Sequence, residues 1–133
     1  MARVTTTFSL WSKTLHPERM SEMLSAVPDR SVLRGIDRDP LRSVPDAYGW
    51  HVTCSDVGQV LVEKTLIDSL KRTSAFSDKI INLKNIDHNL DIRISISITP
   101  YEEDISLFFS ADTAINIVKL GSSFDIEFFD PPE

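Results

Sequence analysis

This sequence has few of the residues from which cofactor sites and disulfide frameworks are built. It contains a single cysteine, Cys54, and three widely separated histidines, His16, His51 and His88. One cysteine forms no internal disulfide, and histidines without paired spacing do not predict a zinc site. None of the four glycines belongs to a phosphate-binding or dinucleotide-binding motif. We therefore expect no metal, no cofactor and no enzymatic activity, and a reducing, cytoplasmic location.

Long apolar runs are also missing. No stretch approaches the roughly 18 apolar residues that span a bilayer. The first dozen residues alternate Thr and Ser with apolar side chains, which is unlike a secretory signal. The 133 residues, 41% of them hydrophobic, suffice for one domain with its own core. We predict a single domain over residues 1–133 that makes no membrane contact.

Positive charge is scarce in the last quarter of the chain. The net charge is −6, and from Tyr101 onward eight acidic residues are opposed only by Lys119. Such a segment repels nucleic acid and attracts basic protein surfaces. The acidic segment therefore has two interpretations: it binds a basic protein partner, or it only keeps the protein soluble.

Alternating apolar and polar residues predict five strands, each with one buried face. No strand is apolar on both faces, which favours a sheet with helices on one side and an open, hydroxyl-rich second side. The predicted strands cover residues 3–10, 48–55, 90–98, 105–109 and 124–128. The open side is expected to carry Thr5, Thr7, Ser9, His51, Thr53, Ser55, Arg93, Ser95, Ser97, Thr99 and Ser106.

Helical spacing of apolar residues predicts about three helices. The first covers residues 17–27, and the second follows a capping pattern formed by Asp56 and Gln59. A short helical turn is expected from Ser77. The last helix is capped by Ser110 and runs to Lys119, with Ala111, Ala114, Ile115 and Val118 directed inward.

These elements give the order β-α-β-α-β-β-α-β. The expected fold is an α+β two-layer sandwich with a mainly antiparallel five-stranded sheet, in which 105–109 pairs with the strand before it. Residues 28–47, rich in Pro and Arg or Asp charges, are interpreted as one long exposed loop.

Candidate chemistry is sparse. His51 and Cys54 are an odd number of residues apart on one strand, so they lie on opposite faces. Acidic clusters at Asp37 and Asp39, and at 102–104, fall in predicted turns, where solvated charge is the ordinary outcome. An enzyme would require Asp37, Asp39 and either His51 or His88 to converge in one cleft.

Three aromatic residues, Trp11, Phe108 and Phe129, lie in or directly after predicted strands, and each falls on the polar phase of the alternation. Exposed aromatic side chains beside acidic residues are suited to anchoring a protein partner. The alternative is that a loop or terminus covers them, or that a bulge reverses the phase.

Almost the whole chain, about residues 3–130, resembles a bacterial family of domains of unknown function numbered 4279. The segments that carry the resemblance are TTTFSLWS, HPERMSEMLSAVP, VPDRSVLRG, YGWHVTCS, LIDSLKRTSAF and INIVKLGSSFDIEFFD. Pro28, Gly35 and Trp50 match best, and they read as fold-defining residues. The resemblance implies an immunity protein encoded near a toxin gene, and it supplies no catalytic residues.

The leading hypothesis is therefore an immunity-type protein that neutralises a cognate bacterial toxin, with a basic surface, by direct binding. The expected contact residues are Glu102, Glu103, Asp104, Phe108, Asp125, Glu127 and Phe129. Two alternatives remain. One is a small-ligand-binding domain that uses Trp11, Trp50, Asp37 and Asp39, and the other is a homodimeric structural module joined through the open sheet face.

Overall fold

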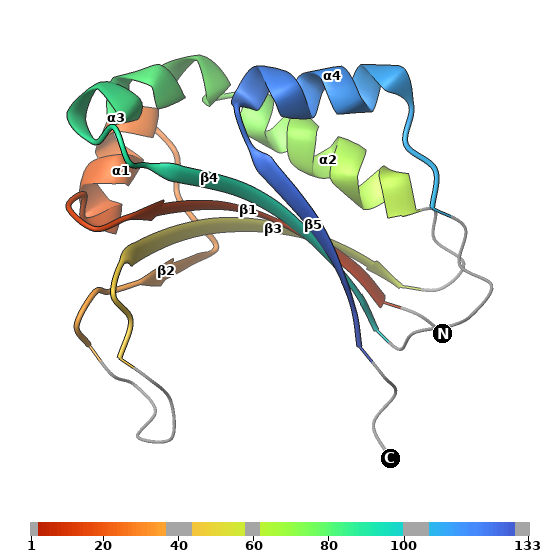
Figure 1. Cartoon of the computed structure of the whole chain (residues 1–133), viewed down its shortest axis with the longest axis horizontal. Helices are drawn as coiled ribbons and strands as arrows, with labels where there is room; N and C mark the ends of the chain where they lie inside the picture. The colour runs from red at the N-terminus through yellow and green to blue at the C-terminus, as the bar shows by residue number, and fades with distance from the viewer. Residues whose placement is uncertain (1–2, 37–43, 58–61, 100–106, 130–133) are drawn as a thin grey trace.

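The fold consists of one five-stranded sheet and a layer of helices (Figure 1). The computed structural model describes residues 3–36, 44–57, 62–99 and 107–129. The strands are β1 (Arg3–Ser12), β2 (Arg30–Val32), β3 (Tyr48–Val57), β4 (Asp91–Thr99) and β5 (Ser123–Phe128). The helices are α1 (Pro17–Leu24), α2 (Val62–Ser74), α3 (Ile80–Ile86) and α4 (Ala111–Leu120), with a 3-10 turn, η1 (Ser77–Lys79), before α3.

The strands are ordered β2-β3-β1-β4-β5 across the sheet. β1 pairs antiparallel with both β3 and β4, β2 pairs antiparallel with β3, and β5 pairs parallel with β4. All four α-helices lie over one side of the sheet, and no described element covers the other side (Figure 1). The α+β class and the five-stranded sheet are therefore confirmed. The sheet is mixed: three of its strand pairs are antiparallel, and the pair of β4 with β5 is parallel.

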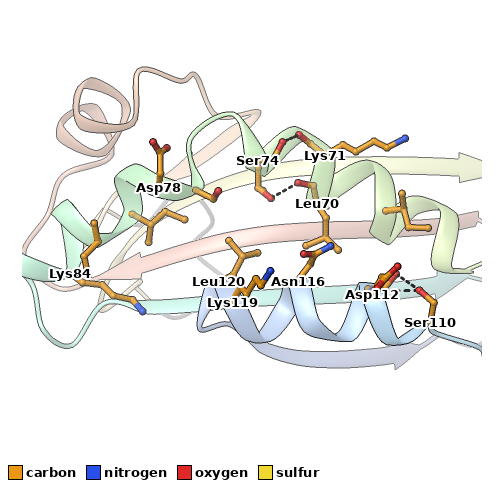
Figure 2. Close-up of a pocket in the computed structure, with 16 residues that line it drawn as sticks. Leu70, Lys71, Ser74, Asp78, Lys84, Ser110, Asp112, Asn116, Lys119 and Leu120 are labelled. Carbon is orange, nitrogen blue, oxygen red and sulfur yellow. Dashed lines mark hydrogen bonds between the residues drawn. The ribbon is translucent and has the colours of Figure 1, made fainter.

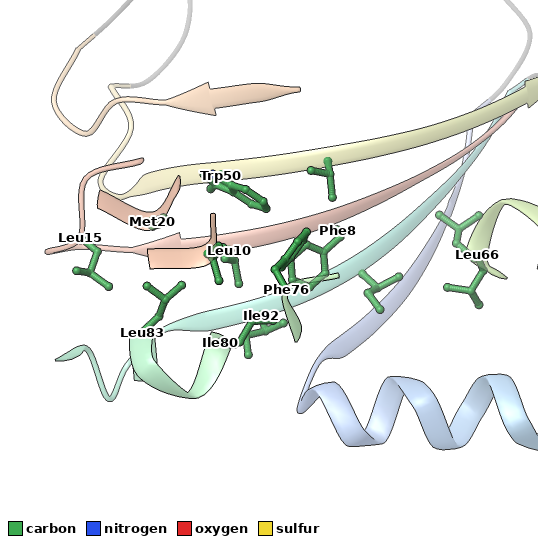
Figure 3. Packing of buried hydrophobic residues seen from close by; sticks show 14 of the residues in the cluster. Phe8, Leu10, Leu15, Met20, Trp50, Leu66, Phe76, Ile80, Leu83 and Ile92 are labelled. Carbon is green, nitrogen blue, oxygen red and sulfur yellow. The ribbon is translucent and has the colours of Figure 1, made fainter. Parts of the chain in front are cut away.

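The alternating residues of the central strand explain where the core forms. Phe8 of β1 stands opposite Val52 of β3 and Ile94 of β4, and all three are buried. The ring of Phe76 packs against those of Phe8 and Trp50, with centroids 5.9 and 5.3 Å apart (Figure 3). Helices and sheet thus share one hydrophobic cluster, as period-two strands with a single apolar face require.

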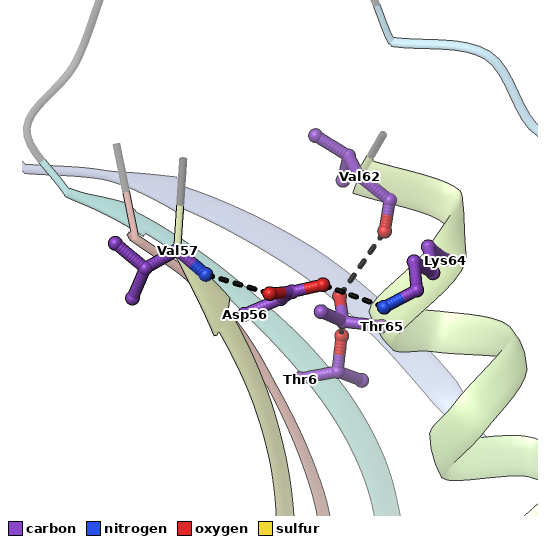
Figure 4. A network of polar contacts seen from close by, with 6 residues as sticks. All are labelled: Thr6, Asp56, Val57, Val62, Lys64 and Thr65. Atoms are coloured by element: carbon purple, nitrogen blue, oxygen red, sulfur yellow. Dashed lines mark hydrogen bonds and ion pairs between the residues drawn. The ribbon is translucent and has the colours of Figure 1, made fainter. Parts of the chain in front are cut away.

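A pair of buried hydroxyl groups fixes α2 on the sheet (Figure 4). The Oγ1 atoms of Thr6 and Thr65 lie 2.8 Å apart, and the Thr65 hydroxyl also donates to the carbonyl oxygen of Val62. Nearby, Asp56 accepts a bond from Lys64 at 2.6 Å. Asp56 belongs to β3 and α2 begins at Val62, so Asp56 is no helix cap; Gln59 lies outside the described residues.

The strand predicted at 105–109 is wrong for the residues that the structure describes. Residues 107–110 have no strand structure, whereas 105 and 106 lie outside the described residues. The outer edge of β4 can hold only one neighbour, and β5 takes that position. Between β4 and β5 the chain crosses back over the sheet through α4. The two strands therefore run in the same direction and pair in parallel.

The segment predicted as a loop over 28–47 contains β2, which was missed. Its three residues are too few to show a period, and only pairing with β3 defines them as a strand. Gly35 adopts a positive φ of 78° that favours glycine, and its N–H donates to the carbonyl oxygen of Pro45. Residues 37–43 lie outside the described residues.

The helices also differ from the prediction at their ends. α1 ends at Leu24 rather than at 27, because Ser25 adopts a left-handed conformation that closes the helix. Val27 is consequently 80% exposed. The turn expected from Ser77 continues into α3, which makes a fourth α-helix. No helix within the described ranges has both the length and the apolar character needed to cross a bilayer.

Candidate partner-binding surface at the β5 edge

The hydroxyl-rich side of the sheet forms as predicted from the alternation. The strand register places Thr5, Ser55 and Ser97 in one row across three strands. The Oγ1 atom of Thr5 and the Oγ atom of Ser55 lie 2.6 Å apart, so the polar side chains bond to one another along the surface. Ser106 lies outside the described residues.

Two residues predicted on this open side, Ser9 and His51, are in fact buried. The indole ring of Trp11 packs on His51, with centroids 4.8 Å apart, and Gly49 leaves room for both rings. A Cβ atom on Gly49 would lie 2.7 Å from His51 Nε2 and 2.8 Å from the Trp11 ring. Trp11 therefore serves as a cover for this part of the sheet.

His51 is held in its neutral form by this packing. Its Nδ1 atom bonds to Ser9 Oγ at 2.7 Å, and its Nε2 atom has no hydrogen-bond partner. Burial, and to a smaller extent the charge of Arg30, lowers the pKa of His51 to about 4. Cys54 lies on the other side of the sheet, as predicted, and burial raises the pKa of its thiol.

The described acidic residues of the predicted contact set lie on β5, the edge strand. Asp125 and Glu127 are both exposed and stand opposite Ser95 and Ser97 of β4. The Ser95 hydroxyl donates to Asp125 Oδ1 at 2.6 Å, which fixes the position of that carboxylate. The predicted contact residues Glu102, Glu103 and Asp104 lie outside the described residues.

Both aromatic residues of the predicted contact set are exposed. Phe108 is 72% exposed in the segment that leads into α4, and Phe129 is 45% exposed directly after β5. The N–H of Phe129 donates to the carbonyl oxygen of Ile98 at 3.0 Å, so its backbone is anchored to β4. Nearby, the ring of Phe109 packs on that of Phe124, with centroids 5.5 Å apart.

α4 exposes the residues that were predicted to be buried. Ala111, Ala114, Ile115 and Val118 all lie in the exposed class, with Val118 at 76%. The buried residue of α4 is Thr113, and the partly buried Ile117 and Leu120 lie on the same side of the helix. The Thr113 backbone N–H donates to the hydroxyl of Ser110, which caps the helix, and the Thr113 hydroxyl also bonds to it. The prediction was wrong because the helix carries apolar residues on both sides, so spacing alone did not select the buried one.

Exposed apolar residues lie both on α4 and on the edge strand β5. Asn116 and Lys119 line a groove beside α2, and helical spacing places Ala114 and Val118 on the opposite flank of α4. On β5 the helix-side residues Phe124 and Phe128 are 38% and 43% exposed. We use the name β5 edge surface for these apolar residues together with the two acidic residues on the open side of β5. The residues of the β5 edge surface are Ala114, Val118, Phe124, Asp125, Ile126, Glu127 and Phe128.

A groove of about 780 Å³ lies between α2, α3 and α4 (Figure 2). Apolar side chains such as Leu70, Ile80 and Leu120 line it, together with Lys84 and Lys119. Neither lysine forms a hydrogen bond or an ion pair with any described residue. No pattern in the sequence indicates this groove, because its walls come from three helices that only the fold brings together.

The residues predicted for a small-ligand site do not form one cluster. Trp50 is wholly buried in the core and donates through Nε1 to Ser21 Oγ at 3.0 Å, whereas Trp11 lies on the opposite side of the sheet. Asp37 and Asp39 lie outside the described residues. His88 is exposed before β4, and no hydrogen bond or ring contact joins it to His51. Within the described ranges, no three His, Cys, Asp or Glu side chains gather in a metal-binding group.

Comparison with known proteins gives one result. A family model described as a domain of unknown function, DUF4279, matches residues 2–130, which is nearly the full length. Neither the curated proteins nor the solved structures provide a match. Because the match extends over far more than half of the sequence, this chain belongs to the DUF4279 family.

Proposed function

We propose that this protein is an immunity-type protein, which neutralises a cognate bacterial toxin in the cytoplasm by binding it directly. The observation that supports the proposal is the position of Asp125 and Glu127 beside exposed aromatic side chains at one edge of the sheet. The binding surface in this proposal is the β5 edge surface together with Phe108 and Phe129. Glu102, Glu103 and Asp104 remain members of it by sequence alone.

Charge and apolar area have different roles in such a contact. Acidic groups at the rim attract a basic partner and raise its association rate, as expected for a toxin that binds nucleic acid. Aromatic and branched side chains supply the buried area that slows dissociation. The exposed Phe108, Val118 and Phe129 leave apolar area in water, and binding a partner would remove it.

The test is to co-express the protein with the product of the neighbouring toxin gene, and to measure both complex formation and survival. Replacing Asp125 and Glu127 with Lys should abolish rescue and slow association. A matched control reverses two exposed charges elsewhere, Glu22 on α1 and Asp68 on α2, and should leave rescue unchanged. Failure of the unmodified protein to bind or protect would refute the proposal.

The groove of Figure 2 favours a second candidate function, the binding of a small amphipathic anion. Its volume lies within the range of small-molecule sites, and Lys84 and Lys119 are available to pair with an acidic group. The probe is anilinonaphthalene sulfonate, whose rings suit the apolar wall. Its fluorescence should rise with the wild-type protein and not with Asn116→Trp, which fills the groove; equal enhancement in both would refute this candidate.

A further inference from the structure

The two edges of the sheet are finished differently. At the β3 edge, beyond the short β2, the side chains of Asp29 and Arg72 form hydrogen bonds with the backbone N–H and C=O of Thr53. The Thr53 N–H donates to Asp29 Oδ2 at 2.8 Å, and its carbonyl oxygen accepts from Arg72 Nη1 at 3.2 Å. Arg72 also binds both carboxylate oxygens of Asp29, at 2.6 and 2.8 Å. This edge is therefore closed by side chains as well as by a strand.

At the β5 edge, no described side chain closes the backbone groups of Ile126 in this way. The N–H of Phe129 points to β4, where it donates to Ile98. Backbone direction alternates along a strand, so Asp125 and Glu127 also direct their backbone groups to β4, and Ile126 directs its N–H and C=O away. No described element pairs with β5 on that side. An edge of this kind is a template for another strand.

The side chains of β5 specify what such a strand would carry. Asp125 and Glu127 lie on the open side of the sheet, and Phe124 and Ile126 lie on the helix side. Residues opposite each other on paired strands share a face. A complementary strand therefore carries basic residues at the positions beside the carboxylates and apolar residues at the positions between them.

A second copy of this chain does not fit that description. Pairing β5 with β5 places Asp125 and Glu127 of one copy beside the same carboxylates of the other, and like charges on facing strands repel. We infer that β5 accepts one extended segment of the partner, in which basic and apolar residues alternate, as a sixth strand of the sheet. The inference rests on the proposed function, since it specifies how the partner of that function is bound.

A seven-residue peptide in which Lys alternates with Val tests the inference on the full chain. Calorimetry should detect binding, and hydrogen exchange should show slower exchange of the Ile126 amide in the complex. Replacing Asp125 and Glu127 with Lys should weaken binding about tenfold, as expected when exposed attractions become repulsions. The same variant should bind a Glu-Val peptide instead. A Lys-Val peptide that is N-methylated at alternate residues should not bind, because it lacks the backbone donors.

The outcomes separate this inference from the proposed function. If toxin binds and cells survive while Ile126 exchange in the complex is unchanged, strand addition is wrong and the proposed function stands. If the peptide binds with protection of Ile126 and no toxin is neutralised, strand addition stands and the proposed function is wrong. Equal binding of the Lys-Val and N-methylated peptides, or protection of Ile126 that rises with protein concentration alone, would overturn strand addition.

Discussion

Acidification should destabilise this protein between pH 6.5 and pH 4 through one residue, His51. The residue is only 3% exposed, and its pKa is lowered from 6.5 to about 4 by burial first and by the charge of Arg30 second. The unfolded chain therefore binds a proton over this interval while the folded chain does not. Stability from the neutral ring is complete above pH 6.5 and is lost as the pH falls towards 4.

The size of the effect follows from the shift in pKa. The interval of about 2.5 pH units corresponds to about 3 kcal/mol, of which acidification from pH 7 to pH 5 removes about 2 kcal/mol. With a urea m-value of about 1.5 kcal/mol/M for a chain of this size, the unfolding midpoint should fall by about 1 M.

Urea titrations at pH 7 and pH 5, followed by tryptophan fluorescence, measure this shift. Trp50 is buried in the core and makes the signal sensitive to unfolding. The control is His51→Gln, which retains a polar side chain and cannot be protonated. The variant should be less stable than the wild type at pH 7, but its midpoint should move much less between the two pH values. An equal shift in both proteins would refute the assignment to His51.

Three further predictions concern packing and polar contacts, and urea unfolding measures each of them. Thr65→Val should lower the free energy of unfolding by about 1–3 kcal/mol, because it leaves the buried Thr6 hydroxyl without its partner. Thr6→Val should cost less, since the Thr65 hydroxyl keeps its bond to the carbonyl oxygen of Val62. The double variant should lose less stability than the sum of the two single losses. Gly49→Ala should cost about 1–3 kcal/mol by overpacking the rings above it, and no loss would mean that those rings move freely. Arg72→Met should cost about 1 kcal/mol at pH 7. Because Arg72 lowers the pKa of Asp29, which is charged above that pKa, this difference should shrink as the pH falls below 4.

The sequence by itself determined the strands that have one apolar face. In β1, β3 and β4, a shift of one residue would exchange core and solvent side chains over the whole strand, so the pattern defines the faces without any tertiary information. The positions of Phe8, His51 and Cys54 on their respective sides were predictable for this reason. The exposure of Asp125, Glu127 and Phe129 also followed from the pattern, although what they bind does not.

Only the tertiary structure decided which neighbours those elements have. β2 is too short to carry a period, the parallel pairing of β5 depends on the path of α4, and the buried side of α4 was chosen by the space left beside α2. His51 has the phase of an exposed residue and is buried because Trp11 packs on it across Gly49. In each case the outcome depends on a contact with a residue that is distant in the sequence. A local sequence pattern does not report the packing energy of such contacts.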